Sequence, residues 1–286
     1  MPPRPDEPAL ERRATGVTVT AVRGRDVRLQ ADRLAGEEPM AIRVAGPGQA
    51  PVDVAVTMRT PGHEAELAVG FLHAEGLISG RDEVAAVDLG DAGDIARPDD
   101  EVLVRLRQPF DAALVGARHF AVSSSCGICG KASLDDIHMR ARPIPDGPVV
   151  APEVLWALPG RLRGAQAVFE ATGGLHAAGL FEADGTLVAV REDIGRHNAL
   201  DKLVGGRLLA GDLPLHGRIL LVSGRAGFDL VQKAAIAGAP ILAAVSAPSD
   251  LAVEAAAQLG MTLVGFLRGD GFNIYTRPDR VATGRA

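Results

Sequence analysis

The feature that most constrains the fold is an alternation of apolar runs and helical patterns in the last third of the chain. Apolar runs at residues 218–223, 241–245 and 261–267 predict buried β-strands, and the stretches between them, 228–237 and 250–259, have helical spacing. This strand–helix–strand–helix–strand order predicts a parallel sheet covered on both faces. Ligands of such sheets bind at the carboxyl ends of the strands.

Small or basic residues follow the three predicted strands, namely Ser223-Gly224-Arg225, Ser246-Ala247-Pro248 and Arg268-Gly269. From residue 217 onward the charges sum to +2, although the whole chain has a formal net charge of −6. A locally basic segment suits a phosphorylated small molecule, and an uneven scatter of surface charge explains it equally well. The acidic balance of the whole chain excludes a nucleic-acid binder that relies on a basic surface.

The first part of the chain has strand patterns of another kind. A helix is predicted at residues 64–75, where the apolar side chains recur every three to four residues and Gly76 follows as a C-cap. Short β-branched segments separated by Gly or polar breaks predict strands, antiparallel in the first four cases, at residues 17–22, 27–29, 40–44, 52–57 and 102–106. The expected fold class is therefore α/β, of the α+β type with a mixed sheet, with an N-terminal antiparallel β subdomain.

The expected domain organisation is simple. Residues 1–15 are predicted to be a disordered N-terminus, and residues 279–286 a tail. A single domain is expected over residues 16–278, β-rich to about residue 110 and α/β from about 111.

Composition excludes two classes of protein. A chain of 286 residues with 47% hydrophobic residues is too apolar to be disordered, and it has no apolar run long enough for a membrane helix. The first 15 residues mix acids with bases and lack the apolar stretch of a signal peptide. A cytoplasmic location is expected.

The chain has only two cysteines, Cys126 and Cys129, within the segment SSSCGICGKASL. In a reducing compartment such a close pair favours chemistry over a structural disulfide. Nearby Lys131 and a predicted helix start would favour the reactive thiolate, and the flanking glycines leave the thiols open. A buried, inert pair is the alternative without chemistry. Dithiol redox chemistry and sulfur transfer both fit, and the spacing alone does not separate them.

A zinc site is a further alternative for the cysteine pair. Zinc needs four ligands, and the deaminase signature would add H-x-E, which His73-Ala74-Glu75 matches. Against this interpretation, Ser125 replaces the proline that precedes the cysteines in that signature. His73 and Glu75 are also ordinary residues for a helix end. We expect no metal site.

Taken together, several segments resemble the formate dehydrogenase accessory sulfurtransferases, the FdhD family. They occur in the family's order over about residues 17–277, and seven ordered segments are far more specific than one C-x-x-C. The matching segments are TPGHEAELAVGFLHAEGLI (60–78), SCGICGKASL (125–134), GGLHAAGLF (173–181), EDIGRHNALDKLVG (192–205), LLVSGRAGFDLVQKAA (220–235), ILAAVSAPSDLAVEAA (241–256) and TLVGFLRGDGFNIYT (262–276).

The resemblance implies a function. Family members carry sulfur from a cysteine desulfurase to the molybdenum cofactor, Mo-bis(molybdopterin guanine dinucleotide), which formate dehydrogenase requires. Cys126 matches the cysteine that becomes the persulfide, and Cys129 matches a second thiol whose role is left open. The resemblance also implies a cytidine-deaminase-like core and a homodimer. The family's cofactor-binding segment falls on Phe266, Leu267, Arg268, Gly269, Asp270 and Gly271.

Two alternatives to this function stay open, a noncatalytic chaperone of the molybdenum cofactor and the zinc hydrolase. Other polar residues have no assigned role. Arg196 and the helix start at Gly195 can hold a phosphate, or the helix is an ordinary capped one with Asp201 and Lys202 in solvent. Arg225 is the better phosphate ligand because of its strand-end position. Three further residues are noted, His176 and His197 as proton carriers or structural residues and Trp156 as a packing residue in a linker.

Overall fold

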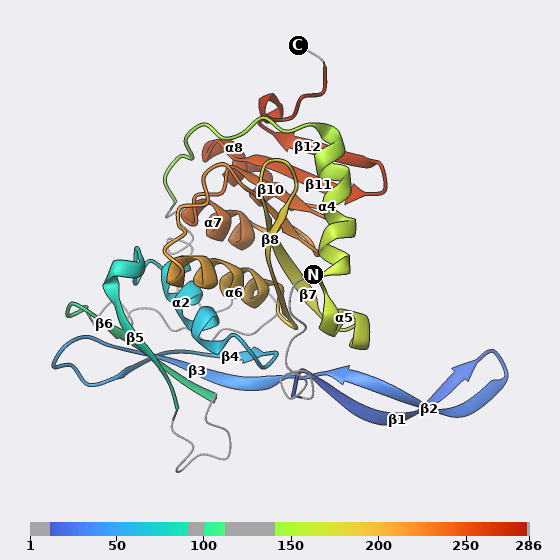
Figure 1. Ribbon diagram of the computed structural model, residues 1–286, viewed down its shortest axis with the longest axis horizontal. Helices are drawn as coiled ribbons and strands as arrows, with labels where there is room; N and C mark the ends of the chain where they lie inside the picture. The colour runs from blue at the N-terminus through green and yellow to red at the C-terminus, as the bar shows by residue number, and fades with distance from the viewer. Residues whose placement is uncertain (1–11, 91–99, 112–140, 285–286) are drawn as a thin grey trace.

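The computed structural model describes residues 12–90, 100–111 and 141–284. The strands are β1 (Ala14–Arg23), β2 (Asp26–Ala35), β3 (Glu38–Ala45), β4 (Val52–Arg59), β5 (Val84–Leu89), β6 (Glu101–Leu106), β7 (His176–Phe181), β8 (Leu187–Asp193), β9 (Ile219–Val222), β10 (Ile241–Ala244), β11 (Thr262–Arg268) and β12 (Gly271–Thr276). The helices are α2 (Glu64–Ala74), α4 (Pro152–Gly164), α5 (Ala167–Thr172), α6 (Arg196–Leu209), α7 (Phe228–Ile236) and α8 (Asp250–Gln258), with short 3-10 turns η1 (Arg81–Glu83) and η4 (Pro278–Arg280). Figure 1 shows their arrangement.

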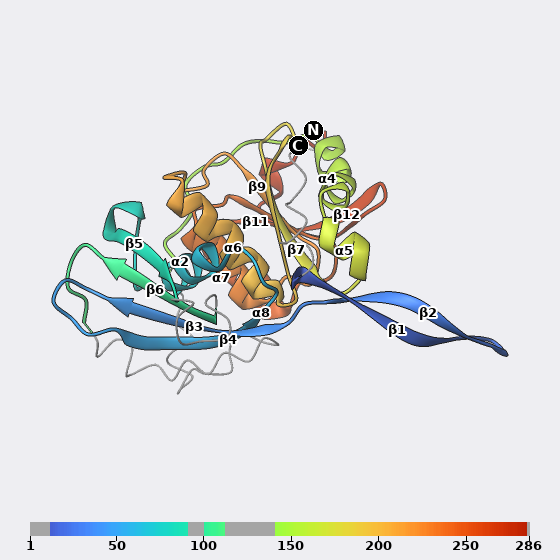
Figure 2. The same cartoon turned by 60° about the horizontal axis from the view of Figure 1, so that its bottom comes forward.

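The C-terminal half is a six-stranded mixed sheet in the order β12-β11-β10-β9-β7-β8. Strands β9, β10 and β11 are parallel neighbours, which confirms the predicted strand–helix alternation. The antiparallel strands β12, β7 and β8 complete the sheet and make it mixed, as expected. Helix α4 covers one face of the sheet, while α6, α7 and α8 cover the other (Figures 1 and 2). Every residue of β9 and β10 is buried, as the apolar runs predict.

The N-terminal half contains a four-stranded sheet in the order β4-β3-β6-β5. Antiparallel pairing is confirmed for β3 with β4. Strand β5, which the sequence did not predict, pairs with β6 in antiparallel fashion, and β3 also pairs with β6 in parallel. Helix α2 packs on this sheet through Leu67, Ala68 and Leu72, all fully buried. The helix ends as predicted, because Gly76 has a φ of 70° that a side chain would oppose.

Two glycines join the halves where α2 crosses α6. A Cβ atom at Gly70 would lie 1.9 Å from the carbonyl oxygen of Asp201, and one at Gly205 would lie 1.9 Å from that of Glu66. The backbones therefore touch, and only glycine permits this approach. This contact fixes the axis of α6, and with it the position of the residues at its first turn.

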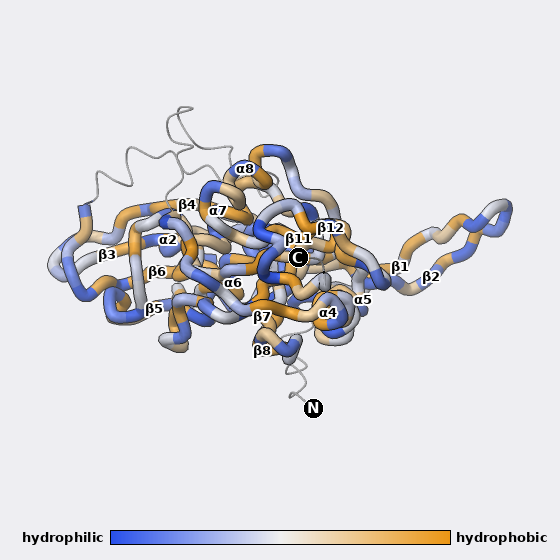
Figure 3. The backbone as a smooth tube through the Cα atoms, turned by 90° about the horizontal axis from the view of Figure 1, so that it is seen from above, coloured by the Kyte–Doolittle hydropathy of each residue, from blue (hydrophilic) through white to orange (hydrophobic). Residues whose placement is uncertain are grey.

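The hairpin β1–β2 extends away from the body as a two-stranded arm (Figures 2 and 3). Cross-strand pairing places Val22, Val27 and Leu29 on one face of the arm, and they are 64%, 63% and 77% exposed. At the base, Ala14 is buried against Val168 and Leu175. Strand β1 thus begins inside the stretch predicted to be disordered, because a buried contact orders Ala14.

Some features expected of the fold remain predictions. The cytidine-deaminase likeness and the boundary near residue 110 are not tested, and the terminal residues 1–11 and 285–286 lie outside the described part. Trp156 does not lie in a linker, because residues 152–164 form α4, which begins with Pro152 in the first turn. Among the described residues, no helix has the length and apolar character needed to cross a membrane.

Candidate functional site

The two cysteines predicted to carry the chemistry, Cys126 and Cys129, lie outside the described residues. Of the predicted functional regions, the structure describes the anion site at the carboxyl ends of the parallel strands.

Three strand ends meet at this edge, which we call the carboxyl edge. The N–H of Ser246, after β10, donates to the carbonyl of Gly224, after β9, at 3.3 Å. The N–H of Phe266, in β11, donates to the carbonyl of Ser246 at 3.1 Å. The segments at residues 223–225 and 246–248 therefore lie side by side, as the parallel order predicts.

His176, at the start of β7, also lies at the carboxyl edge. Its ring approaches Gly224 so closely that a Cβ there would lie 3.3 Å from Nδ1 of His176. The hydroxyl of the adjacent Ser223 accepts a hydrogen bond from the N–H of Ala177 at 2.9 Å. His176 and Ser223 line a cavity of about 400 Å³ together with Gln166, Phe169, Gly173, Gly174 and Leu175.

Two arginines and two histidines act on one another electrostatically here. Burial lowers the pKa of His176, and the charges of Arg196 and Arg225 lower it further. Burial, followed by Lys233 and Arg196, lowers the pKa of His197 to about 3. Both rings are therefore neutral near pH 7. Within the described part of the chain Arg196 and Arg225 form no ion pair, so the site has two uncompensated positive charges.

The acidic residues of the EDIGRHN segment have structural roles. One carboxylate oxygen of Asp193 accepts hydrogen bonds from the N–H of Gly195 at 2.8 Å and from the amide of Asn198 at 3.1 Å. The other accepts from the N–H of Thr60 at 3.1 Å. The N–H of Gly195, which we expected to be available to a phosphate, is thus already occupied. Of that predicted phosphate site, the side chain of Arg196 remains available.

The alternative in which α6 is an ordinary capped helix with Asp201 and Lys202 in solvent is wrong. Lys202 is fully buried, with its Nζ 2.6 Å from the carboxylate of Asp193 and 2.7 Å from the carbonyl of Thr60. Asp201 is also buried and pairs with Lys233 at 2.7 Å. A helical pattern does not reveal this, because α2 packs on the face of α6 that an isolated helix would present to water.

The predicted cofactor segment spans the end of β11 and the turn into β12. Phe266 adopts a φ of 53° at an irregularity in the β11–β12 pairing, and the guanidinium of Arg268 lies 5.7 Å from its ring centroid. The side chain of Leu267 is buried in the core. The segment from Arg268 to Gly271 is exposed. Exposed backbone and one free guanidinium suit a pyrophosphate ligand.

Of the residues of the zinc alternative, the structure describes His73 and Glu75, which lie at the end of α2. The Nδ1 atom of His73 is hydrogen-bonded to the carbonyl of Ile78 at 3.2 Å, and burial lowers the pKa of His73. Glu75 is the C-cap of α2. In the described residues no three His, Cys, Asp or Glu side chains are grouped to hold a metal ion.

Sequence reasoning singled out His176, Arg196, His197 and Arg225 separately, and the structure brings them together. The sequence did not connect Trp156 with the cofactor segment. In the structure, Trp156 lines one cavity together with Asp270 and Gly271 of that segment. Two features of the sequence could have drawn attention to Trp156. Pro152 is a typical first residue of a helix, and aromatic residues form only 3% of the chain.

Comparison with known proteins gives concordant matches. The model of the FdhD/NarQ family matches residues 35–282. The "Sulfur carrier protein FdhD" of Streptomyces coelicolor is 50% identical over 275 residues, which cover 92% of this chain and 94% of that protein. The protein of the same name from Mycobacterium tuberculosis is 50% identical over 260 residues, covering 87% of this chain and 92% of the relative.

A solved structure has the same fold. It belongs to a protein of Desulfotalea psychrophila described as a proposed formate dehydrogenase accessory protein. The TM-score is 0.74 at 22% sequence identity, and the match covers 94% of this chain and 99% of the other.

Proposed function

The chain belongs to the FdhD/NarQ family, and from this premise we propose that it is a sulfur carrier that serves formate dehydrogenase. The observation that carries the proposal is the single C-x-x-C, formed by the only two cysteines of a chain that matches the family over residues 35–282. Any sulfur carried covalently as a persulfide must pass through Cys126 or Cys129.

The first step is a transfer of sulfur between thiols. The Cys126 thiolate attacks the outer sulfur of a persulfide on a cysteine desulfurase. A new S–S bond forms at Cys126, and the desulfurase thiolate leaves. The transferred sulfur keeps its oxidation state, so this step needs no oxidant or reductant. A thiolate is required, which favours a reducing compartment and hence the cytoplasm. Cys129 supplies a second thiol near the first.

The recipient in this proposal is Mo-bis(molybdopterin guanine dinucleotide), bound as a substrate and passed on to formate dehydrogenase. Its pyrophosphates would meet Arg196 and Arg225, whose charges have no carboxylate partner in the described part of the chain. Phe266 to Gly271 would contribute the neighbouring contacts, with Arg268 as their one cation. Neutral His176 can give or accept one hydrogen bond at the edge of the site.

The proposal includes a homodimer. The arm β1–β2 supports it, because the face bearing Val22, Val27 and Leu29 continues through Thr18, Thr20 and Ala31 without a charge. Such a ribbon is marginal alone, and a second copy can cover it without bringing like charges together.

Intact-mass analysis tests the sulfur-carrying step. After incubation with a cysteine desulfurase and cysteine, the protein should gain sulfur that a thiol reductant removes. The Cys129→Ala variant is the matched control, because it changes the other thiol of the same pair. An unchanged adduct on Cys126→Ala would contradict the assignment to Cys126.

Two other functions make different predictions. A noncatalytic cofactor chaperone would still activate formate dehydrogenase in cells that carry Cys126→Ala. A zinc hydrolase would contain stoichiometric metal after purification, which metal analysis detects.

A further inference from the structure

Two adjoining cavities lie at the end of the parallel strands that is opposite to the carboxyl edge. Their volumes are about 670 Å³ and 650 Å³. Residues 213–216, which lead into β9, and residues 236–238, which lead into β10, contribute to their lining. The two cavities form one groove, which we call the amino-edge groove, because they share the lining residues His73, Ser79, Pro214 and Ile236.

The floor of the amino-edge groove is apolar and closely packed. The N–H of Leu215 donates to the carbonyl of Ala237 at 2.8 Å, which joins the segment before β9 to the end of α7. A Cβ atom at Gly238 would lie only 2.6 Å from Cβ of Pro214, so these two segments touch. The apolar surface of the floor comes from Leu213, Pro214 and Ile236. A partner gains free energy by burying apolar side chains against it.

Three exposed arginines surround this floor, Arg81 and Arg107 in one cavity and Arg142 in the other. The side chains of Arg107 and Arg142 make no ion pair or hydrogen bond within the described part of the chain. The side chain of Arg81 donates to the carbonyl of Val84 at 2.7 Å. Among the described lining residues Asp82 is the one acid. The groove is therefore basic in a chain with a net charge of −6, and it attracts carboxylates.

The unpaired arginines are a property of the groove and not of this whole end of the molecule. Arg207 and Arg218, before and after the connection between α6 and β9, both pair with Asp212, at 3.6 Å and 2.6 Å. An apolar floor with unpaired charged groups at its edge is the pattern of a surface that recognises another protein. The sign of the charge makes the complementary segment acidic.

The place of the groove indicates which protein it receives. The cofactor is proposed to bind at the carboxyl edge, at the other end of the same strands, so a protein in the groove does not compete with it. Arg142 follows Cys129 by 13 residues, and the chain between them spans at most about 45 Å. A protein docked at Arg142 is thus within reach of the cysteine pair. These features favour the sulfur donor over the recipient enzyme, which takes the cofactor from the carboxyl edge.

We propose that the amino-edge groove is the docking site of the cysteine desulfurase, which places an acidic segment with apolar side chains in it. Carboxylates of that segment pair with Arg107 and Arg142, and its apolar side chains pack on Pro214 and Ile236. The inference rests on the proposed function, since it gives the sulfur donor of that proposal a place on this chain.

Binding kinetics of the full-length protein on an immobilised cysteine desulfurase test the proposal. At low salt, Arg107→Glu and Arg142→Glu should each lower the association rate about threefold or more, and the double variant about tenfold or more. The reason is that attraction between opposite charges is replaced by repulsion. Raising the salt should remove most of this difference. Ile236→Ala should instead raise the dissociation rate about threefold or more, because it removes apolar contact area.

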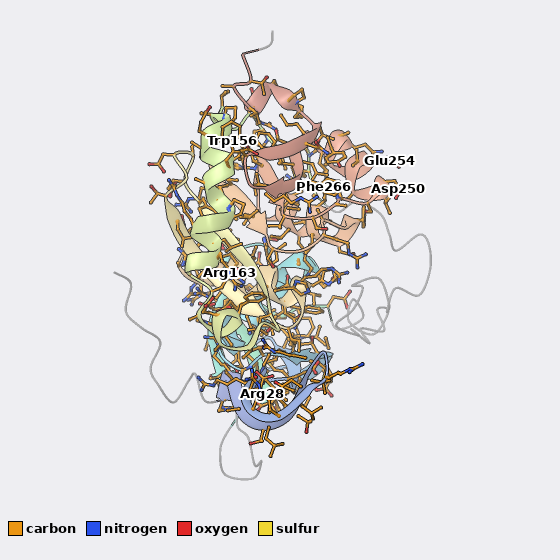
Figure 4. The ribbon with its side chains drawn as sticks, turned by 90° about the vertical axis from the view of Figure 1, so that its right-hand side faces the viewer. Arg28, Trp156, Arg163, Asp250, Glu254 and Phe266 are labelled. Atoms are coloured by element: carbon orange, nitrogen blue, oxygen red, sulfur yellow. The ribbon has the colours of Figure 1, made fainter. Side chains whose placement is uncertain are left out.

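Arg28→Glu is the matched control for the charge reversals. Arg28 is also exposed and has no ion pair within the described residues, and Figure 4 shows it on the arm β1–β2. The strand alternation places Arg28 on the opposite face of the arm from Val27 and Leu29, so the proposed dimer contact is kept. Its binding kinetics with the desulfurase should equal those of the unaltered protein.

The rate of sulfur loading separates docking from chemistry. In the double variant, the desulfurase concentration that gives half-maximal loading should rise about tenfold, while the maximal rate stays unchanged. A residue that acts on the thiols would lower the maximal rate instead. Urea unfolding should show the stability of the unaltered protein, because both side chains are exposed and unpaired in the described part of the chain.

Four results would overturn the inference. Unchanged desulfurase kinetics in the double variant would exclude the groove and leave the sulfur carrier function intact, and an equal loss in Arg28→Glu would have the same meaning. Weaker binding of formate dehydrogenase, with unchanged binding of the desulfurase, would assign the groove to the recipient enzyme. If the unaltered protein bound no desulfurase at all, the docking site and the proposed sulfur donor would both be refuted.

Discussion

Replacing Gly70 by Ala tests whether the contact between α2 and α6 holds the two halves of the molecule in register. The new methyl carbon would lie 1.9 Å from the carbonyl oxygen of Asp201, whereas ordinary contacts of this kind exceed 3 Å. The helices must therefore separate by more than 1 Å. Overpacking of this kind costs about 1–3 kcal/mol. It outweighs the roughly 0.5–1 kcal/mol that alanine gains over glycine within a helix.

Gly160 supplies the matched control, because it lies in α4 and a Cβ there would meet no atom within 4 Å. In urea unfolding, Gly160→Ala should raise the free energy of unfolding by about 0.5–1 kcal/mol. Gly70→Ala should lower it by the difference between the overpacking cost and the helix gain, up to about 2.5 kcal/mol. The refuting result is a Gly70→Ala protein as stable as Gly160→Ala. In that case the close approach of the two backbones would not be a constraint on the fold.

Four further predictions follow from the described contacts. Lys202→Met leaves the buried carboxylate of Asp193 without its cation and should cost about 3–5 kcal/mol of unfolding free energy, and a second change, Asp193→Asn, should recover part of it. Because burial lowers the pKa of His197 to about 3, the unfolded chain binds a proton that the folded chain excludes. Stability should therefore fall as the pH drops from about 6.5 toward 3, less steeply in His197→Gln. Arg225→Gln should weaken pyrophosphate binding about tenfold, measured by calorimetry, and lessen its dependence on salt. Leu29→Asp should convert the proposed homodimer to a monomer in sedimentation analysis, and a dimer of unchanged affinity would exclude the arm as the interface.

The parallel strands and their helices could be predicted because their apolar runs are continuous and each is buried by its neighbours in sequence. The sequence did not predict the strands β7 and β8 or the helix α4. For α4 the reason is that it contains Pro159 and that its pattern of apolar residues is weak. The arm was predicted as strands, but no sequence pattern shows that it stands away from the body. Apolar and polar residues alternate along the arm in the same way as along a strand that packs on a core.

The site was predictable where chemistry depends on residue type and strand order. Arg225 and the carboxyl edge came from strand order, and the cysteine pair came from its rarity. The burial of Lys202 and the use of the Gly195 N–H by Asp193 depend on contacts between residues far apart in the chain. The position of Trp156 beside Asp270 depends on how α4 lies across the sheet, which sequence periodicity does not determine.

A single-turnover transfer experiment tests the central claim most directly. The protein is loaded with radioactive sulfur by a cysteine desulfurase, separated from it, and mixed with reduced Mo-bis(molybdopterin guanine dinucleotide), which can supply the two electrons that convert persulfide sulfur to sulfide, and with cofactor-free formate dehydrogenase. We predict that the label leaves the protein, appears in the cofactor, and does so in step with enzyme activity, whereas Cys126→Ala transfers no label. Activation of formate dehydrogenase while the label stays on the protein would contradict a sulfur carrier.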